Sequence, residues 1–351
     1  MSFFRKDLVG KKPVVVDVPH KKVMMCLNES SLDPYQAVKS EFLELMENIH
    51  LNRYYSWITA TLKKELAAYV EVTQDMIIMG NGADELLYYL FLAVNDPQAF
   101  ALTLSPSYFD YLSYCQAVGL PLKMLPLEKD FSFSTARFLE MAADSACKLL
   151  ILCNPNNPTG NLFPQEQLEE IIAADKERLV LIDETYFEFS GVSWLPKLAR
   201  YPNLIILRTF SKAFSAAGLR FGYLVAGTKV ISEIRKVVTA FNLSILSQTM
   251  ALAILHNKAI FLQHNQSIVT ERERLANELR KFPEITVFPS STNFILFRYQ
   301  KSVDLFTYLI ACDIALRDVG SFEVLENCLR VTVGNMKEND MFISRIMRFM
   351  K

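Results

Sequence analysis

The sequence predicts an α/β protein with a large domain, whose mostly parallel sheet is covered by helices, and a smaller α+β domain. Short apolar runs alternate with longer helical patterns up to about Phe241, which is typical of βαβ units. After Phe241 this alternation stops. The chain of 351 residues is 51% hydrophobic, enough to build about two cores. We expect a large domain over residues 46–240 and a small domain formed by residues 1–45 and 241–351.

The elements of the large domain follow from the lengths of the apolar runs. Runs of four to six residues bounded by polar segments are predicted as buried strands. These runs are Met76–Met79, Ala99–Leu104, Lys148–Cys153, Leu179–Ile182, Leu204–Arg208 and Tyr223–Ala226. Helical patterns lie between them at Asp84–Ala93, Tyr108–Val118, Gln165–Ala174 and Val230–Val238. Strands separated by helices favour parallel pairing.

The remainder of the chain has longer helices and fewer strands. Helical patterns cover Ser244–His256 and Ala259–Phe282, and the charges of Glu271–Arg274 indicate a solvated face on the second. The predicted elements that follow are Thr286–Phe288, Phe294–Tyr299, a helix near Val303–Ala311, a strand at Leu329–Val333 and a terminal helix from Lys337.

Composition excludes several classes of protein. The chain has 37 basic and 38 acidic residues with a net charge of -1, so bulk charge predicts no nucleic-acid partner. The charges at Arg5, Lys6 and Asp7 are not followed by an apolar stretch, and no run is long enough to span a membrane. We therefore expect neither a signal peptide nor a membrane partner, and a cytoplasmic location.

Cysteine and histidine spacing gives no sign of a metal site. None of the six cysteines forms a C-x-x-C pair, and several lie in apolar runs, which favours buried free thiols. The four histidines have no metal-ligand spacing. We predict no metal.

Two loops that follow predicted strands are candidates for ligand contacts. In open α/β sheets, ligands bind beyond the carboxyl ends of the strands. Gly80–Glu85, G-N-G-A-D-E, is either a plain strand–helix turn or a site where helix N–H groups bind an anion. Asn154–Gly160, N-P-N-N-P-T-G, holds two X-Pro pairs, which fix an irregular loop more firmly than a simple turn requires.

Two further loops carry ionisable side chains. Asp183 follows a buried strand, where it is either a structural acid or a partner for a ligand nitrogen. Lys212, between Phe210 and Phe214, is either a surface lysine or a desolvated amine available for imine chemistry. Ser211 and Arg220 are suited to a phosphate.

Together these loops supply what pyridoxal phosphate requires: an acid for the pyridinium nitrogen, a lysine for a Schiff base and donors for a phosphate. The motifs G-N-G-A-D-E, N-P-N-N-P-T-G, D-E-T-Y, T-F-S-K and G-L-R-F-G resemble those of fold-type-I pyridoxal-phosphate aminotransferases. More closely, the chain is similar to the histidinol-phosphate aminotransferase branch, from about Leu27 to the C-terminus.

The resemblance implies a role for each matched residue. Lys212 carries the cofactor covalently and then moves the substrate proton, while Asp183 keeps the pyridine nitrogen protonated. The other implied cofactor contacts are Asn157 and Tyr186 at the ring 3'-oxygen, Tyr108 stacked on the ring, and Gly82, Ala83, Asp84, Ser211 and Arg220 at the phosphate. Tyr54 matches a family tyrosine that reaches the neighbouring subunit's phosphate, which implies a homodimer with shared active sites.

Substrate contacts are implied at three other positions. Arg330 matches the arginine that binds the substrate's anionic end, Arg317 matches a second phosphate-binding arginine, and Asn28 lies in the segment that closes the site. Glu29–Pro34 departs from the family's usual E-N-P-x-G-P, Tyr55 replaces a proline, and the family's early tyrosine is absent before Tyr35.

The sequence after Arg317 leaves the substrate open. Arg317–Phe322, R-D-V-G-S-F, is similar to threonine-phosphate decarboxylases, whereas histidinol-phosphate enzymes commonly follow the arginine with proline. The leading hypothesis is an aminotransferase that moves an amino group between histidinol phosphate and 2-oxoglutarate in histidine biosynthesis. The alternatives are a threonine-phosphate decarboxylase, an aromatic amino-acid aminotransferase, or a cofactor-binding regulator. Intact Lys212 and Asp183, without a basic DNA-binding extension, argue against the regulator.

Overall fold

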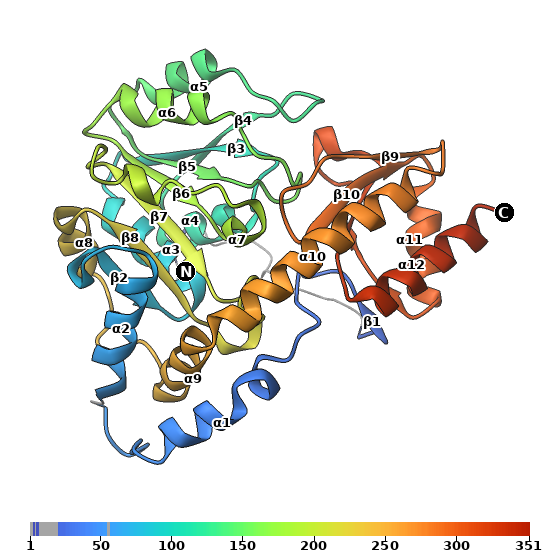
Figure 1. Ribbon diagram of the computed structural model, residues 1–351. Coiled ribbons are helices and arrows are strands. Elements are labelled where there is room, and N and C mark those ends of the chain that lie inside the picture. The colour runs from blue at the N-terminus through green and yellow to red at the C-terminus, as the bar shows by residue number, and fades with distance from the viewer. Residues whose placement is uncertain (1–2, 4, 7–19, 55–56) are drawn as a thin grey trace.

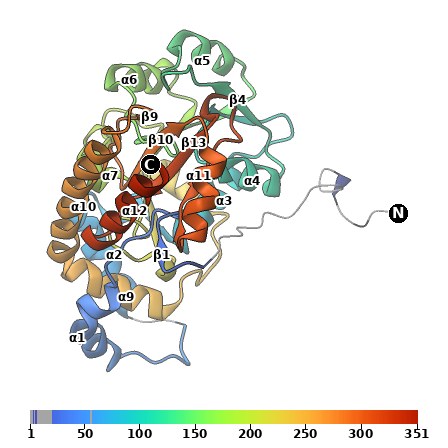
Figure 2. The ribbon, with the colours of Figure 1, turned by 90° about the vertical axis from the view of Figure 1, so that its right-hand side faces the viewer.

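The computed structural model describes residues 3, 5–6, 20–54 and 57–351. Asp7 and Tyr55, discussed above, lie outside the described residues. Figure 1 shows a large sheet with its helices, and a smaller sheet that α10 (Lys258–Leu279) connects to the rest. In Figure 2 the smaller sheet, with α11 (Ser302–Ala311) and α12 (Met336–Phe349), faces the viewer.

The large sheet has seven strands in the order β2-β8-β7-β6-β5-β3-β4. Their bounds are β2 Ile77–Gly80, β3 Phe100–Ser105, β4 Leu122–Pro126, β5 Cys147–Cys153, β6 Leu179–Asp183, β7 Leu204–Thr209 and β8 Gly222–Ala226. β4, β3, β5, β6 and β7 pair in parallel, and β8 pairs antiparallel with both β7 and β2. The ends of β2, β3, β5, β6 and β7 and the start of β8 therefore lie at one edge of the sheet.

Helices cover both faces of this sheet, as the continuous apolar runs of its strands require. In β5, Leu150 and Leu152 point to one apolar cluster, while Leu149 and Ile151 point to the other. The first cluster includes α2 (Trp57–Tyr69), α5 (Thr135–Ala142), α6 (Gln165–Ala174) and α9 (Ile245–His256). The second includes α3 (Gly82–Val94), α4 (Asp110–Val118) and α8 (Thr228–Arg235). The predicted α/β class is confirmed.

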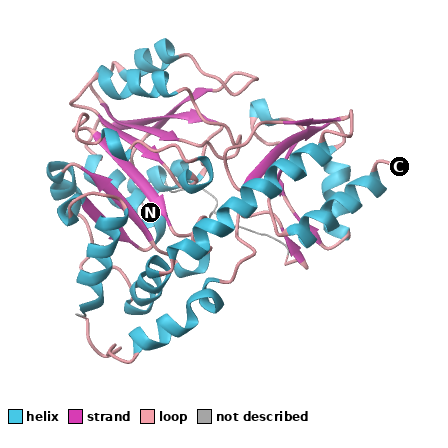
Figure 3. Ribbon diagram, viewed as in Figure 1, coloured by secondary structure: helices cyan, strands magenta, loops and turns pink. Residues whose placement is uncertain are grey.

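The second sheet has four strands in the order β12-β13-β10-β9, all antiparallel. Their bounds are β9 Ile285–Val287, β10 Phe294–Tyr299, β12 Arg317–Asp318 and β13 Cys328–Thr332. α10, α11 and α12 contribute to its apolar cluster. β1 (Val23–Met24) and β11 (Ile314–Ala315) form a separate parallel pair, so the N-terminal segment is anchored beside this sheet (Figure 3).

The division at residues 46 and 240 stays a prediction, and the packing at its two boundaries bears on it. α1 (Pro34–Met46) and α9 lie outside the predicted large domain. Nevertheless Val38 of α1 and Leu252 of α9 belong to the apolar cluster of the large sheet.

Some elements have no counterpart in the predicted set. β4 is an edge strand whose side chains are mostly solvent-accessible and which ends at Pro126, so it lacks the apolar run of a buried strand. α5 and the short α7 (Phe187–Ser190) were also not predicted. Among the described residues no single helix is long and apolar enough to cross a membrane; α9 and α10 meet that criterion only together, across a bend of 73°.

Candidate active site

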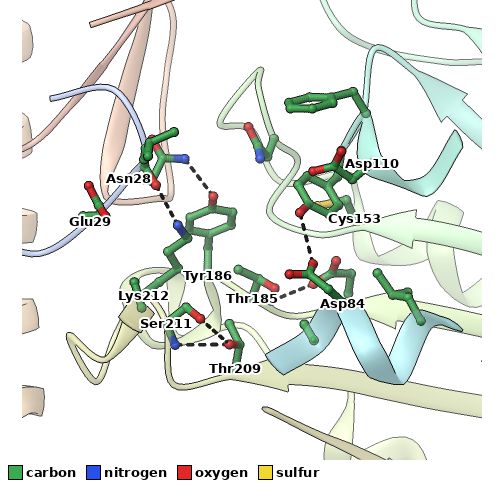
Figure 4. Close-up of a pocket in the computed structure, with 18 of the residues that line it drawn as sticks. Asn28, Glu29, Asp84, Asp110, Cys153, Thr185, Tyr186, Thr209, Ser211 and Lys212 are labelled. Carbon is green, nitrogen blue, oxygen red and sulfur yellow. Dashed lines mark hydrogen bonds between the residues drawn. The ribbon is translucent and has the colours of Figure 1, made fainter. Parts of the chain in front are cut away.

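A cavity of about 450 Å³ opens at the edge of the large sheet where the strand ends gather. Its walls come from the segment before α1, the starts of α3 and α4, the loops after β5, β6 and β7, and β12 and β13 of the second sheet. Of the predicted site residues it contains Asn28, Ala83, Asp84, Tyr108, Asn157, Asp183, Tyr186, Ser211, Lys212, Arg220, Arg317 and Arg330. Figure 4 shows Lys212, Tyr186 and Asn28 on one side and Asp84 and Asp110 on the other. The sheet thus brings together polar residues that lie far apart in the sequence.

Lys212 is a half-buried amine in the loop after β7. Its Nζ donates a hydrogen bond to the Leu27 carbonyl at 2.7 Å. Burial, with the positive charge of Arg330 as the second cause, lowers the pKa of Lys212 to about 8. The side chain is therefore a neutral amine in a sizeable fraction of molecules near neutral pH, as a nucleophile or base must be.

Asp183 ends β6 and is only 4% exposed. Its carboxylate accepts hydrogen bonds from the Tyr111 hydroxyl at 2.6 Å and from the Thr185 N–H at 3.0 Å. Burial raises the pKa of Asp183, while these hydrogen bonds oppose the rise. Such an acid is suited to bind a positively charged ligand atom, because the pair then compensates for its lost hydration.

The Tyr111 hydroxyl was not predicted as part of the site. The side chain is fully buried in the first turn of α4, and its ring meets that of Tyr108, which precedes the helix, edge to face with ring centres 5.2 Å apart. The sequence pattern placed Tyr111 inside a helix but gave no sign that its hydroxyl reaches Asp183.

Two glycines let the start of α3 approach β8 closely. Gly82 has φ +82°, and a Cβ there would lie 2.5 Å from an Arg220 nitrogen. A Cβ on Gly222 would lie 2.8 Å from the Ala83 nitrogen. The first-turn N–H groups of any helix have no intrahelical partners, and at this end of α3 no side chain caps them.

Arg220 and Ser211 stand beside these N–H groups. Arg220 forms an ion pair of 2.5 Å with Asp84, and one of its nitrogens lies 3.5 Å from Ser211 Oγ. The Tyr108 hydroxyl donates to the other oxygen of Asp84 at 3.2 Å. N–H groups at a helix start beside an arginine and a serine can bind a phosphate.

On the opposite side of the cavity, the side chains hold one another in place. Asn28 Nδ2 donates to the Tyr186 hydroxyl at 2.8 Å. Arg330 donates to Asn157 Oδ1 at 2.6 Å and to the Cys26 carbonyl at 2.8 Å. Burial lowers the pKa of Arg330, and its Nε atom has no partner among the described residues.

Arg317 lies beside Arg330, since the two residues are paired across β12 and β13. Its guanidinium is 5.8 Å from the centre of the Phe109 ring, which comes from the large sheet's side of the cavity. Two neighbouring arginines with an unsatisfied buried N–H provide a site for an anionic group.

Tyr54 does not contribute to the cavity of its own chain. It is 83% exposed and stacks on Phe241, with ring centres 4.9 Å apart. Gly82 does not line the cavity either, and acts through the close approach of α3 to Arg220.

The residues present fit pyridoxal phosphate. One cavity combines a buried acid, an amine of lowered pKa and a phosphate-binding corner at a helix start. These are the groups that hold the ring nitrogen, the aldehyde carbon and the phosphate of this cofactor.

Comparison with known proteins gives the family. Residues 20–346 match the family described as aminotransferase class I and II. The chain belongs to this family and is an aminotransferase.

Three relatives show which enzymes of known name this chain is similar to. A histidinol-phosphate aminotransferase of Caldanaerobacter subterraneus subsp. tengcongensis is 34% identical over 346 residues, covering 98% of each chain. The histidinol-phosphate aminotransferase of Sinorhizobium meliloti, solved in complex with pyridoxal-5'-phosphate, matches with a TM-score of 0.87 at 22% identity, covering 100% of this chain and 98% of the other. An L-threonine-O-3-phosphate decarboxylase of Porphyromonas gingivalis matches with a TM-score of 0.79 at 22% identity, covering 93% of this chain and 99% of the other. The fold is thus shared by both enzymes considered above.

Proposed function

We propose that this aminotransferase binds pyridoxal phosphate through Lys212 and transfers an amino group between histidinol phosphate and 2-oxoglutarate. The observation that carries the proposal is one cavity that joins two sets of groups. Lys212 and Asp183 come from the large sheet and its loops, and we call their end of the cavity the inner end. The Arg317–Arg330 pair comes from the second sheet, and we call its end the outer end. The relative with 34% identity over nearly the whole chain bears the name of this activity.

The chain's residues divide the work between binding and proton transfer. When bound, pyridoxal phosphate supplies an electron sink that lets a proton leave the carbon bearing the amine. Lys212 takes and returns that proton, for which its lowered pKa is suited. Asp183 holds a proton on the ring nitrogen, and Tyr111 fixes the direction of its carboxylate.

Other residues orient the cofactor. The first turn of α3, Ser211 and Arg220 bind its phosphate, with Asp84 holding the guanidinium in place. Tyr108 stacks on the ring, and Asn157 and Tyr186 contact the ring oxygen, each kept in position by its hydrogen bond to Arg330 or Asn28.

The outer arginines select an anionic amine. Histidinol phosphate has no carboxylate, so its phosphate takes the positions beside Arg330 and Arg317. Glutamate uses the same surface for its carboxylates in the second half-reaction. Arg330 is buried and Arg317 is half-buried, which excludes part of the competing water and so strengthens these contacts.

Threonine-phosphate decarboxylation is the second candidate. The observation that favours it is the R-D-V-G-S-F stretch from Arg317, in which Asp318 accepts a hydrogen bond from the Gly320 N–H at 2.8 Å and forms a tight turn. The arginine spacing suits both substrates, and we place the aminotransferase first because the curated relative with full coverage carries that name.

A homodimer completes the proposal. Large apolar side chains are exposed around the loop between α1 and α2 and the chain before α9: Leu51, Tyr54, Trp57, Phe241 and Leu246. A monomer rarely exposes such a group together, and a second copy of the chain would cover it. In this assembly Tyr54 reaches the phosphate of the partner's cofactor, and the enzyme works in the cytoplasm on small molecules.

The proposal is tested by the half-reaction. Holoenzyme is mixed separately with histidinol phosphate, glutamate, phenylalanine and threonine phosphate, and absorbance follows conversion of the bound cofactor to its amine form. Rapid conversion with histidinol phosphate and glutamate supports the proposal. Release of carbon dioxide from threonine phosphate, without conversion by histidinol phosphate, establishes the second candidate instead.

The shared site has its own test. Lys212→Ala and Tyr54→Ala proteins, each inactive, are mixed under conditions of subunit exchange. Some heterodimers then hold one site with both residues intact, so activity returns. Exchange without any return of activity, or an active monomer, contradicts the shared site.

A further inference from the structure

A short segment ahead of α1 forms one wall of the cavity. We call residues 26–32 the strap. The Cys26 carbonyl accepts a hydrogen bond from Arg330, and the Leu27 carbonyl accepts one from Lys212. Asn28 binds the Tyr186 hydroxyl (Figure 4). Three consecutive residues of the strap therefore contact three residues of the proposed site.

The middle of the strap is anchored to the second sheet. Asn28 has φ +54°, in the left-handed region that few residues other than glycine adopt. Its N–H donates to Thr332 Oγ1 at 2.9 Å, and its carbonyl accepts from Asn293 Nδ2 at 3.0 Å. These bonds hold a strained backbone that would otherwise relax.

The later part of the strap is held by a different group of residues. Ser30 Oγ lies 3.1 Å from His264 Nε2 on α10 and accepts a hydrogen bond from the Ser215 hydroxyl at 2.8 Å. It also accepts one from the Leu32 N–H at 3.2 Å. Ser215 lies three residues after Lys212 in the same loop and has φ +57°.

Counting donors assigns a state to the histidine. A serine hydroxyl has one proton and two lone pairs. With Ser215 and Leu32 as donors, Ser30 uses both lone pairs and gives its proton to His264 Nε2. In this arrangement the Nε2 atom accepts, and the imidazole is neutral with its proton on Nδ1.

We propose that His264 is a positioning residue for the aminotransferase reaction. Its neutral ring accepts a hydrogen bond from Ser30, and Ser30 in turn connects the strap to the loop that carries Lys212 through Ser215. We call these two hydrogen bonds the latch. The latch sets the placement of the Cys26 and Asn28 groups that orient Arg330 and Tyr186. The inference rests on the proposed site around Lys212, and it does not depend on which amine the enzyme prefers.

The latch is sensitive to pH. A protonated His264 presents an Nε2–H to an oxygen whose lone pairs are already used, so one of the Ser30 bonds has to break. Burial lowers the pKa of His264 from its usual 6.5 and is the only cause of the shift. Glu29 of the strap and Glu338 of α12 line a cavity together with Ser30 and Ser215, and Lys212 lies in the same loop as Ser215. Because the folded-state pKa lies below 6.5, the latch is closed at neutral pH and loses stability as the pH falls from 6.5 towards that lower pKa.

The test uses three variants and one matched control. His264→Leu removes the acceptor, His264→Gln offers an amide oxygen in its place, and Ser30→Ala removes the hydroxyl. The control is His256→Gln, which changes the exposed histidine at the end of α9 that binds Glu41 of α1. Holoenzyme of each variant is treated briefly with a glutamate-specific protease, and cleavage after Glu29 is measured relative to cleavage after Glu47. KM and kcat are measured between pH 5.5 and 8.5.

We expect His264→Leu and Ser30→Ala to raise relative cleavage after Glu29 about fivefold at pH 7.5, the effect of losing one hydrogen bond. KM for the amine rises by a similar factor, with a smaller change in kcat. Wild-type protein shows faster relative cleavage and a higher KM at pH 5.5, and His264→Gln loses this pH dependence while staying close to wild type at pH 7.5. His256→Gln behaves as wild type throughout.

Two results would overturn the inference. One is unchanged cleavage and KM in His264→Leu, or in Ser30→Ala if the leucine variant does not fold. The other is a His264→Gln protein with the acid dependence of wild type. If histidinol phosphate does not react with wild-type holoenzyme, the proposed function fails, while the cleavage ratio, which needs no substrate, still decides the role of His264.

Discussion

The two ends of the cavity are built in different ways. The inner end consists of strand ends of one sheet: Cys153 of β5 pairs with Asp183 of β6, which pairs with Leu207 of β7. The outer end joins Arg330 of the second sheet with Cys26 of the strap and Asn157 of the large sheet. Sheet register therefore positions the inner groups, whereas the outer groups depend on contacts between distant parts of the chain.

Under the proposed function, this difference separates the residues of the chemical step from the residues that select the substrate. The parallel ladder and two helix layers hold Asp183 and Lys212 rigidly, as proton transfer requires. The outer groups are held by a few hydrogen bonds between distant segments, some of which involve the strained Asn28. Substitutions at the inner end should affect turnover most strongly, and those at the outer end should mainly affect binding.

The largest effect is expected for Lys212→Ala. The variant loses the amine that moves the substrate proton, so the half-reaction rate should fall about 10⁴-fold, the upper range for general acid–base catalysis. Cofactor binding should persist through Arg220, Ser211 and the start of α3. Stopped-flow absorbance measures the rate, and borohydride reduction of wild-type holoenzyme followed by peptide mapping locates the label. A pyridoxyl group on another lysine would place the reaction elsewhere.

Asp183→Asn should come next. An ion pair between Asp183 and a protonated ring nitrogen is largely desolvated, and losing one partner of a buried pair costs about 3–5 kcal/mol. The half-reaction should slow by roughly 150- to 5,000-fold at saturating cofactor. Tyr111→Phe, which keeps the acid but removes its hydrogen bond, is the matched control and should lose far less. A nearly normal rate in Asp183→Asn would argue against this role.

At the outer end, Arg330→Lys should change binding rather than chemistry. Lysine keeps the charge but lacks the planar fork of donors that binds a phosphate through two parallel hydrogen bonds, so histidinol phosphate should bind about 1–3 kcal/mol more weakly. KM should rise with little change in kcat, whereas the inner substitutions lower kcat. Steady-state kinetics with histidinol phosphate and glutamate give both constants. A fall in kcat by the same factor as the rise in KM would contradict the division between the two ends.

Local sequence patterns predicted the inner end well. The ends of β5, β6 and β7 were recognisable because each buried strand is followed at once by polar residues, such as Asn154, Asp183 and Ser211. The positions of these strands are confirmed to within one or two residues. Their role in cofactor binding stays a prediction that the geometry supports.

The outer end was beyond local patterns. The pairing of Arg317 with Arg330 depends on the register of β12, a strand of two residues. One contact of the inner end was also missed, because the bond between Tyr111 and Asp183 joins positions 72 residues apart. The exposed edge strand β4 was missed for a similar reason, because neighbours rather than its own composition determine its conformation.

The smallest expected effect is that of the Arg330 charge, at the outer end, on the pKa of Lys212 at the inner end. The pKa of Lys212 is lowered to about 8 chiefly by burial, with the Arg330 charge as the second cause. In cofactor-free protein the Lys212 amine should therefore react with an amine-specific acylating reagent with a midpoint near pH 8, against about 10.4 for an exposed lysine. Between these values the unfolded chain binds one more proton at this site than the folded chain, so the contribution of Lys212 to stability increases with pH across that range.

Arg330→Gln removes the repelling charge and should move the midpoint upward by less than one unit, while Arg330→Lys, which keeps the charge, should leave it near 8. Mass spectrometry of the acylated Lys212 peptide gives the midpoint for each protein. A midpoint that does not move in Arg330→Gln would show that the Arg330 charge does not lower the pKa of Lys212. The two ends of the cavity would then be linked only through hydrogen bonds.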